Sequence, residues 1–200
     1  MRRRPPAVKR LSAVLLTTAL ASLALVPTAT ASPDGPTRAV GTVDLARYTG
    51  AWWQLAAVPQ LFELQCAKNV KAVYGTTGRG RVAVTNSCTT WLGTPSRITG
   101  EALPLDGTNA RLNVSFLPGK DGYRHGTEAN YVVAGLGPAY EWAVVTDEDR
   151  TSGFVLARAP RLDPARTADV LRAIRGAGLD PHDFRTTRQD GGDPTWRLAP

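Results

Sequence analysis

Eight short runs of alternating apolar and polar residues, separated by turn-forming residues, constrain the fold of this chain more than any other feature. In one of them Leu112, Val114 and Phe116 share a face and polar residues take the other, which is typical of a strand with one wet face. Closing eight consecutive antiparallel strands into a barrel removes both unpaired edges. The sequence therefore predicts an all-β, eight-stranded antiparallel up-and-down β-barrel. Its strands are expected at residues 50–58, 68–74, 81–86, 97–103, 110–117, 130–135, 140–146 and 153–159.

One α-helix is expected after the last strand. Asp163 is a suitable N-cap, Pro164 suits the first helical position, and Gly176 to Gly178 end the helical pattern. Between them Ala168, Leu171 and Ile174 form an apolar stripe.

The charge of the chain is concentrated at its start. Of the formal net charge of +7, residues 1–31 contribute five basic and no acidic side chains, which leaves 19 basic against 17 acidic ones, or +2. No strongly cationic domain remains, so the sequence predicts no nucleic-acid partner. The basic start, an apolar run at 11–26 and small residues up to Ala31 predict a secretory signal peptide at 1–31.

The alternative to a cleaved signal is an uncleaved anchor, but the apolar run is shorter than the roughly 20 residues of a membrane span. We expect a flexible leader at 32–42, the barrel domain at 43–189 and a mobile tail at 190–200. The alternative for the tail is that Trp196 docks on the domain. The mature chain is expected to be secreted or held in the cell envelope, with no transmembrane helix. No cysteine stands directly after the apolar run to accept a lipid at a lipoprotein-type cleavage site, so no lipid anchor is expected.

Export would place the two cysteines in an oxidising compartment, where pairing is favoured. Cys66 and Cys88 flank a predicted hairpin whose turn is rich in glycine. A turn centred on Thr77 would set Val70 opposite Val84 and Cys66 opposite Cys88, so a disulfide is predicted. Two unpaired buried thiols are the alternative. A metal site is not expected, because His125 and His182 have no ligand spacing near them, and no cofactor is predicted.

Several motifs in order resemble the lipocalin family, in particular its bacterial and apolipoprotein D-like members. They are YTGAWWQLA at 48–56, Phe62-Glu63, Cys66, NVKAVY at 69–74, LNVSF at 112–116, YEWAVV at 140–145 and FVLARAP at 154–160. The resemblance covers residues 43–189. It implies a barrel with the helix packed outside, open at one end. At the closed end it implies structural roles for Gly50, Trp52 and Arg158. The chain departs from the family pattern at 136–138 and at Phe154.

The function that follows is reversible binding of a small hydrophobic molecule inside the barrel, for transport, storage or scavenging. The resemblance suggests fatty acids or lysophospholipids. The alternative for each wall position is barrel core without ligand contact, because one β-bulge reverses the inward direction. The predicted wall consists of Gln54, Ala56, Val70, Ala72, Val84, Leu112, Val114, Phe116, Tyr131, Val133, Trp142 and Phe154.

Topology predicts that the loops at 59–65, 89–95, 118–128 and 147–152 surround the mouth. Leu61, Phe62 and Leu64 would then form an exposed lip for transient contact with a membrane surface, or would pack back on the rim. A monomer or weak dimer is expected. Two other functions stay open: a lipocalin-type enzyme acting on a lipid or other apolar substrate, and a protein-interaction module that uses the mouth loops. No catalytic residue is predicted, since the chain has two histidines and no Gly-x-Ser-x-Gly motif.

Overall fold

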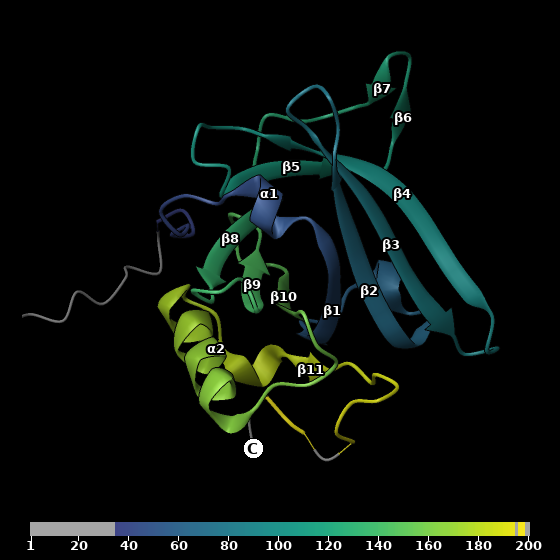
Figure 1. The fold of residues 1–200 in the computed structure, drawn as a ribbon, viewed down its shortest axis with the longest axis vertical. Helices are drawn as coiled ribbons and strands as arrows, with labels where there is room; N and C mark the ends of the chain where they lie inside the picture. Colours follow the sequence, from purple (N-terminus) through teal and green to yellow (C-terminus); the bar gives the residue numbers. More distant parts are fainter. Residues whose placement is uncertain (1–34, 195, 199–200) are drawn as a thin grey trace, which may run out of the picture. The chain divides into compact units, whose positions relative to one another are not determined.

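The structure is a computed structural model that describes residues 35–194 and 196–198, so the predicted signal peptide lies outside the described residues. Within them, eight antiparallel strands form a sheet that closes because β10 pairs with β1 (Figure 1). The predicted barrel and its eight strands are confirmed. The strands are β1 (Gly50–Ala57), β2 (Cys66–Thr76), β3 (Val82–Thr90), β4 (Pro95–Pro104), β5 (Arg111–Ser115), β8 (Tyr131–Leu136), β9 (Trp142–Thr146) and β10 (Gly153–Ala157).

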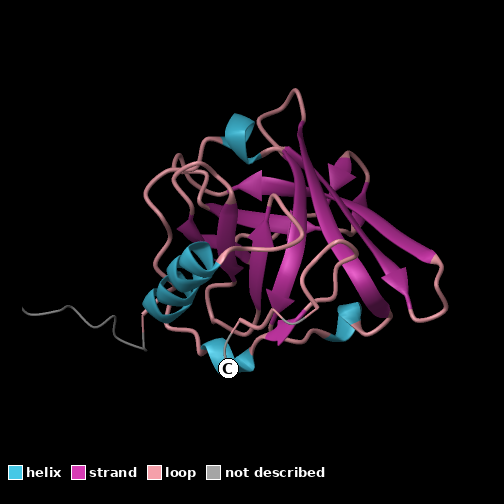
Figure 2. Ribbon diagram, turned by 60° about the horizontal axis from the view of Figure 1, so that its bottom comes forward, coloured by secondary structure: helices cyan, strands magenta, loops and turns pink. Residues whose placement is uncertain are grey.

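Shorter elements accompany the barrel. The predicted helix is α2, in which the Asp163 side chain accepts a hydrogen bond from the Arg166 N–H. It packs outside the barrel against β8 and β9 (Figure 2). A ninth strand, β11, pairs with the mouth half of β1. The elements are α1 (Leu45–Tyr48), η1 (Leu61–Glu63), β6 (Pro118–Gly119), β7 (Gly122–Tyr123), α2 (Pro164–Gly176), η2 (Pro181–Asp183) and β11 (Arg185–Thr186).

Apolar clusters lie on both faces of the sheet. The interior cluster includes Trp52, Leu112 and Val145, and the helix-side cluster includes Val170 and Ile174 of α2. Both α2 residues are fully buried, and burial of each contributes about 1.5–3 kcal/mol to folding. All five residues of β9 are buried, because this strand lies between the interior and α2.

The β2–β3 hairpin has a different register from the predicted one. Thr77 N–H donates to the carbonyl of Arg81, so the turn spans these residues and is centred two positions later than expected. Tyr74, and not Val70, therefore lies opposite Val84. A turn two residues further along shifts every pair by four positions, and the prediction of direct opposition is wrong.

The disulfide between Cys66 and Cys88 is nevertheless present, with its Cα atoms 5.6 Å apart. Continuing the hairpin register without interruption would place Cys66 opposite Leu92, four residues from Cys88. Two β-bulges in β2, one on each side of Lys68, instead bring Cys66 opposite Thr90 and diagonal to Cys88. The disulfide prediction is confirmed, although bulges and not the predicted register bring the sulfurs together.

The segment before β1 covers one end of the barrel. Val43 N–H donates to the Thr108 carbonyl at 2.8 Å, and Asp44 N–H donates to the Tyr140 hydroxyl at 2.9 Å. The Arg47 guanidinium lies 4.0 Å from the centre of the Tyr140 ring. These contacts tie the segment to the connections after β4 and β8, and we call this the closed end. The opposite end, where η1 and the β3–β4 turn lie, is the mouth.

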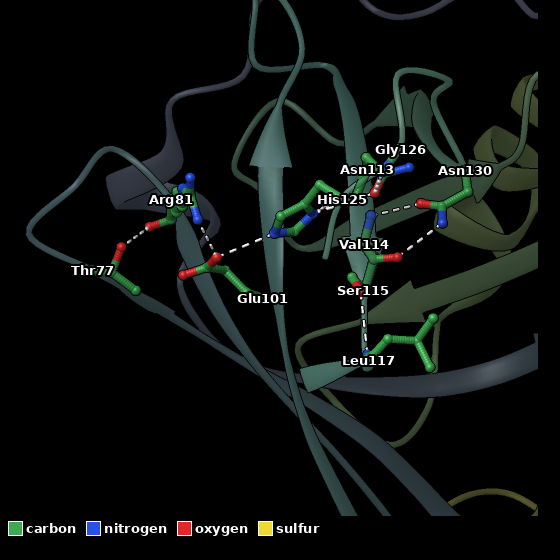
Figure 3. A network of polar contacts seen from close by, with 10 residues as sticks. All are labelled: Thr77, Arg81, Glu101, Asn113, Val114, Ser115, Leu117, His125, Gly126 and Asn130. Atoms are coloured by element: carbon green, nitrogen blue, oxygen red, sulfur yellow. Dashed lines mark hydrogen bonds and ion pairs between the residues drawn. The ribbon is translucent and has the colours of Figure 1, made fainter. Parts of the chain in front are cut away.

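The connection between β5 and β8 does not surround the mouth as predicted. It folds back over the outer face of the sheet, where the His125 ring lies between Glu101 Oε1 at 3.1 Å and the Asn113 carbonyl at 3.0 Å (Figure 3). Glu101 also accepts from Arg81 at 2.8 Å, beside the closed-end turn of the β2–β3 hairpin. Strand order determines the end at which a loop begins, but the buried polar contacts of His125 decide where this long loop packs.

A side chain completes the seam between β5 and β8. These strands share two register pairs, Arg111 with Val132 and Leu112 with Tyr131. Beyond them the Asn130 amide accepts from the Val114 N–H at 2.7 Å and donates to its carbonyl at 2.9 Å (Figure 3). The amide thus continues the ladder where β8 has not yet begun.

Candidate ligand-binding site

Eight of the twelve predicted wall residues belong to the interior cluster. Ala72, Val84, Leu112 and Val133 are buried there. The other four pack against the cluster and keep partial exposure, so side chains do not completely fill the inward face of the barrel. These four are Val114, Phe116, Tyr131 and Phe154.

Two predicted wall residues, Ala56 and Trp142, lie in the helix-side cluster, and the expectation that they face the interior is wrong. A bulge between Gln54 and Ala56 reverses the alternation inherited from the start of β1. Trp142 lies beneath α2, since a Cβ on Gly135 would be 3.3 Å from its ring and 2.6 Å from Ala173 Cβ. In a strand that is apolar on both faces, alternation does not reveal the inward side.

Gln54 and Val70 mark the seam between the mouth halves of β1 and β2. The buried Gln54 side chain donates to Glu63 Oε2 at 3.2 Å and to Thr187 Oγ1 at 3.3 Å. The Gln189 amide bridges the two strands, donating to the carbonyls of Gln54 at 2.6 Å and Val70 at 3.1 Å. The C-terminal segment therefore fills this gap in the wall. Burial raises the pKa of the Glu63 carboxyl, with the hydrogen bond from Gln54 opposing the shift.

Three tyrosine hydroxyls meet inside the barrel. Tyr131 Oη lies 2.9 Å from Tyr48 Oη and 3.0 Å from Tyr74 Oη, and we call these residues the hydroxyl triad. Burial raises the pKa of Tyr74 to about 12 and raises the pKa values of Tyr48 and Tyr131 further. The triad is therefore neutral at physiological pH. Sequence analysis missed two members: Tyr74 continues the inward alternation of Ala72, whereas Tyr48 precedes the strands and carries no such signal.

A cavity of about 20 Å³ adjoins the triad, which is enough for one water molecule or one polar group of similar size. None of the eleven residues that line it carries a charge. They are Val43, Leu45, Tyr48, Tyr74, Val82, Ala102, Asn109, Leu112, Val114, Tyr131 and Val133.

Asn86 is a second interior polar residue that the sequence analysis missed. It follows Val82 and Val84 in the inward alternation of β3, opposite Ala72. Its Oδ1 is buried and has no hydrogen-bond partner in the described part of the chain. An unpaired buried acceptor costs about 1–3 kcal/mol, so the site leaves this atom free for a donor.

Arg158 lies across Trp52 at the closed end, where the resemblance implied it. Its Cζ is 3.8 Å from the centre of the indole ring, and it donates to the carbonyls of Arg47, Ala51 and Tyr140 at 2.8, 2.9 and 3.3 Å. Gly50 has φ +92°, and a Cβ there would lie 3.3 Å from Arg158 Nη1. Both the backbone conformation and the close approach favour glycine at this position.

Five exposed apolar side chains form a lip at the mouth. They come from two loops held together by the disulfide and by Trp91, whose indole N–H donates to the Leu64 carbonyl at 2.8 Å. The predicted lip residues do not pack back on the rim. We define the apolar lip as Leu61, Phe62, Leu64, Trp91 and Leu92, which are 65–89% exposed; the last two were not predicted.

A larger groove, of about 780 Å³, lies outside the barrel along the C-terminal segment and includes Leu55, Phe184 and Leu198. Trp196 lines it and docks on α2, where its indole N–H donates to Thr167 Oγ1 at 3.1 Å. Its walls mix apolar residues with the arginines of the C-terminal segment.

Over residues 35–194 and 196–198, no cluster of three or more His, Cys, Asp or Glu side chains is arranged to hold a metal ion. No helix in that part of the chain is long and apolar enough to cross a membrane.

Comparison with known proteins identifies one family. The model of the lipocalin-like domain matches residues 43–189. Temperature-induced lipocalin-1 of Arabidopsis thaliana is 24% identical over 161 residues, which cover 79% of this chain and 86% of that protein. Among solved structures, insecticyanin from the tobacco hornworm Manduca sexta superposes with a TM-score of 0.60 at 19% identity, covering 76% of this chain and 83% of its own. The tryptamine complex of the amine-binding protein of Rhodnius prolixus gives a TM-score of 0.57 at 17% identity, with 76% and 86% covered.

Proposed function

This chain belongs to the lipocalin family, and from that premise we propose that its barrel reversibly binds a small hydrophobic or amphipathic molecule. The observation that carries the proposal is an apolar inward face that side chains leave incompletely filled at Phe116, Tyr131 and Phe154. Each methylene buried there contributes about 0.8 kcal/mol before ordering costs. The Rhodnius prolixus amine-binding protein, which shares the fold, has been captured with tryptamine.

The ligand class we propose is a fatty acid or a lysophospholipid, in keeping with the motifs shared with the bacterial and apolipoprotein D-like group. None of the fully buried polar residues of the described chain is charged, so a charged head group would remain at the mouth while the acyl chain enters the barrel. The role would be transport, storage or scavenging, without catalysis.

We further propose that the chain is secreted after cleavage near Ala31 and works as a monomer or weak dimer. The apolar lip would then touch a lipid surface while the ligand is exchanged. A tryptophan among leucines suits the boundary between lipid and water. The disulfide holds both lip loops in place, so they need little ordering on contact.

Native mass spectrometry of the secreted, untagged chain tests the carrier function, followed by extraction and lipid analysis of what it holds. A stoichiometric amphiphile supports the proposal and identifies its class. A chain that arrives empty and also refuses a panel of fatty acids and lysophospholipids would overturn it.

Vesicle flotation tests the lip separately. We expect Leu61→Ser with Phe62→Ser to reduce binding to phosphatidylcholine vesicles about tenfold. The matched control Leu117→Ser, at a 67% exposed leucine outside the lip, should leave binding unchanged. Equal binding by both variants would refute a membrane role for the lip.

A further inference from the structure

The hydroxyl triad has one hydrogen-bond donor more than it can use internally. Three hydroxyl groups carry three hydrogens, and two hydrogen bonds join them through Tyr131. In the described part of the chain these hydroxyl oxygens form no further hydrogen bond. Since an unmade buried hydrogen bond is costly, one donor is available to an oxygen that enters beside the triad.

The triad cannot balance a negative charge. The residues around its cavity are neutral, and its own pKa values keep the hydroxyls protonated. The cation whose field reaches Tyr48 and Tyr74 is Arg158, whose donors are already bonded to three carbonyls at the closed end. A carboxylate here would be buried with one donor, and Arg158 has its donors committed to carbonyls and cannot bond it directly, which is unfavourable. A neutral oxygen needs only the one donor.

The triad is also within reach of the space inside the barrel. Tyr48 and Tyr74 are 5% and 8% exposed, whereas Tyr131 keeps partial exposure like Phe116 and Phe154 on the inward face. Tyr131 is thus the least buried member of the triad, and the adjoining cavity, which all three tyrosines line, accepts a group the size of a water molecule.

We propose that the hydroxyl triad is a neutral, single-donor site that hydrogen-bonds a hydroxyl or keto oxygen on the buried part of the carried molecule. This rests on the proposed carrier function and narrows it: the preferred ligand is an amphiphile whose chain carries such an oxygen, with its charged end at the mouth. The triad thereby selects among ligands that would otherwise gain similar energy from apolar burial.

A matched set of ligands tests the selectivity. We would measure binding of stearate, of stearates with a hydroxyl at successive mid-chain positions, and of the corresponding keto acids. At one position the oxygenated chain should bind about three- to tenfold more tightly than stearate, the gain expected from one net hydrogen bond. The stretch of the keto carbonyl in the bound keto acid should lie at lower frequency than in a hydrocarbon solvent, because a hydrogen bond weakens the C=O bond.

The combined variant Tyr48→Phe, Tyr74→Phe and Tyr131→Phe removes all three hydroxyls, because deleting Tyr131 alone would free the donors of the other two. It should abolish both the preference for the oxygenated chain and the shift of the carbonyl stretch, with stearate affinity measured on the same variant as the reference. Tyr123→Phe is the matched control, because the Tyr123 hydroxyl contacts Thr99 Oγ1 in the β6–β7 region, away from the triad. If the triple variant does not fold, the ligand series and the infrared shift of the unaltered chain still decide the matter.

The outcomes separate the two levels of the proposal. Stearate binding with no gain at any oxygenated position overturns the triad site and leaves the carrier function intact. Failure of every ligand in the series to bind overturns the carrier function and the triad site together.

Discussion

Removing the disulfide should cost this domain a large part of its stability. Cys66 and Cys88 are 22 residues apart, and closing a loop of that length lowers the entropy of the unfolded chain enough to stabilise the fold by about 3.4 kcal/mol at 25 °C. For a domain of this size that corresponds to a fall in Tm of about 7–14 °C. The cross-link acts mainly on the unfolded state, so the folded barrel should keep its spectrum.

Urea unfolding of the oxidised chain and of the same chain in excess dithiothreitol measures this effect without changing any other atom. Reduction should lower the free energy of unfolding by the stated amount and raise the m-value, because the reduced unfolded chain exposes more surface. Cys66→Ala with Cys88→Ala should agree with the reduced chain. A loss below about 1 kcal/mol would refute the reasoning and show that the cross-link restricts the unfolded chain far less than its loop length implies.

Four further predictions concern single side chains. Arg158→Ala should lower the free energy of unfolding by about 2–4 kcal/mol, since the cation–π contact and three hydrogen bonds are lost together; a change within 0.5 kcal/mol, roughly that of an ordinary surface site, would contradict it. Asn86→Leu should leave the free energy of unfolding unchanged or raise it by about 1 kcal/mol, because the substitution removes an unpaired buried acceptor. A clear loss in the free energy of unfolding would show that the amide has a partner. Burial raises the pKa of Glu101, but hydrogen bonds from Arg81 and His125 outweigh burial, so the pKa in the folded chain lies below its ordinary value. The contribution of Glu101 to the free energy of unfolding is therefore complete above pH about 4.5 and is lost as the pH falls through the lowered pKa. Glu101→Gln should remove that acid-side loss in a pH series of denaturant titrations. Glu63, whose pKa is raised by burial, contributes in the opposite sense. Its contribution to the free energy of unfolding is lost as the pH rises through the raised pKa, and Glu63→Gln should remove that loss.

The chain topology could be predicted from the sequence because each strand has a recognisable pattern in its own few residues. Alternation of polar and apolar residues shows where a strand has one wet face, and the turn residues between the runs show where it ends. The capped pattern from Asp163 to Gly176 is local in the same way. Closure followed from counting the strands, since a barrel leaves no edge unpaired.

The wall of the site could be predicted only in part, because inward direction depends on register. Leu112 and Val114 lie in an unbulged strand, Phe116 directly follows its end, and all three face the interior as expected. Ala56 follows a bulge and Trp142 lies in a strand buried on both faces, and both turned out to pack under the helix. A bulge changes the count of residues against a partner strand, and that partner is not visible in the local sequence.

What the sequence alone determined is the barrel, the outer helix, the cysteine pair and most of one apolar wall, all of which follow from periodicity and from chemistry that depends on near neighbours in the chain. Other contacts appear only in the folded chain: the hydroxyls of Tyr48, Tyr74 and Tyr131 meet, His125 holds a loop over Glu101, and Gln189 bridges β1 and β2. These contacts join residues from 24 to 135 positions apart. Such a pairing arises when the sheet closes and brings distant strands to one level of the barrel, and no local pattern encodes it.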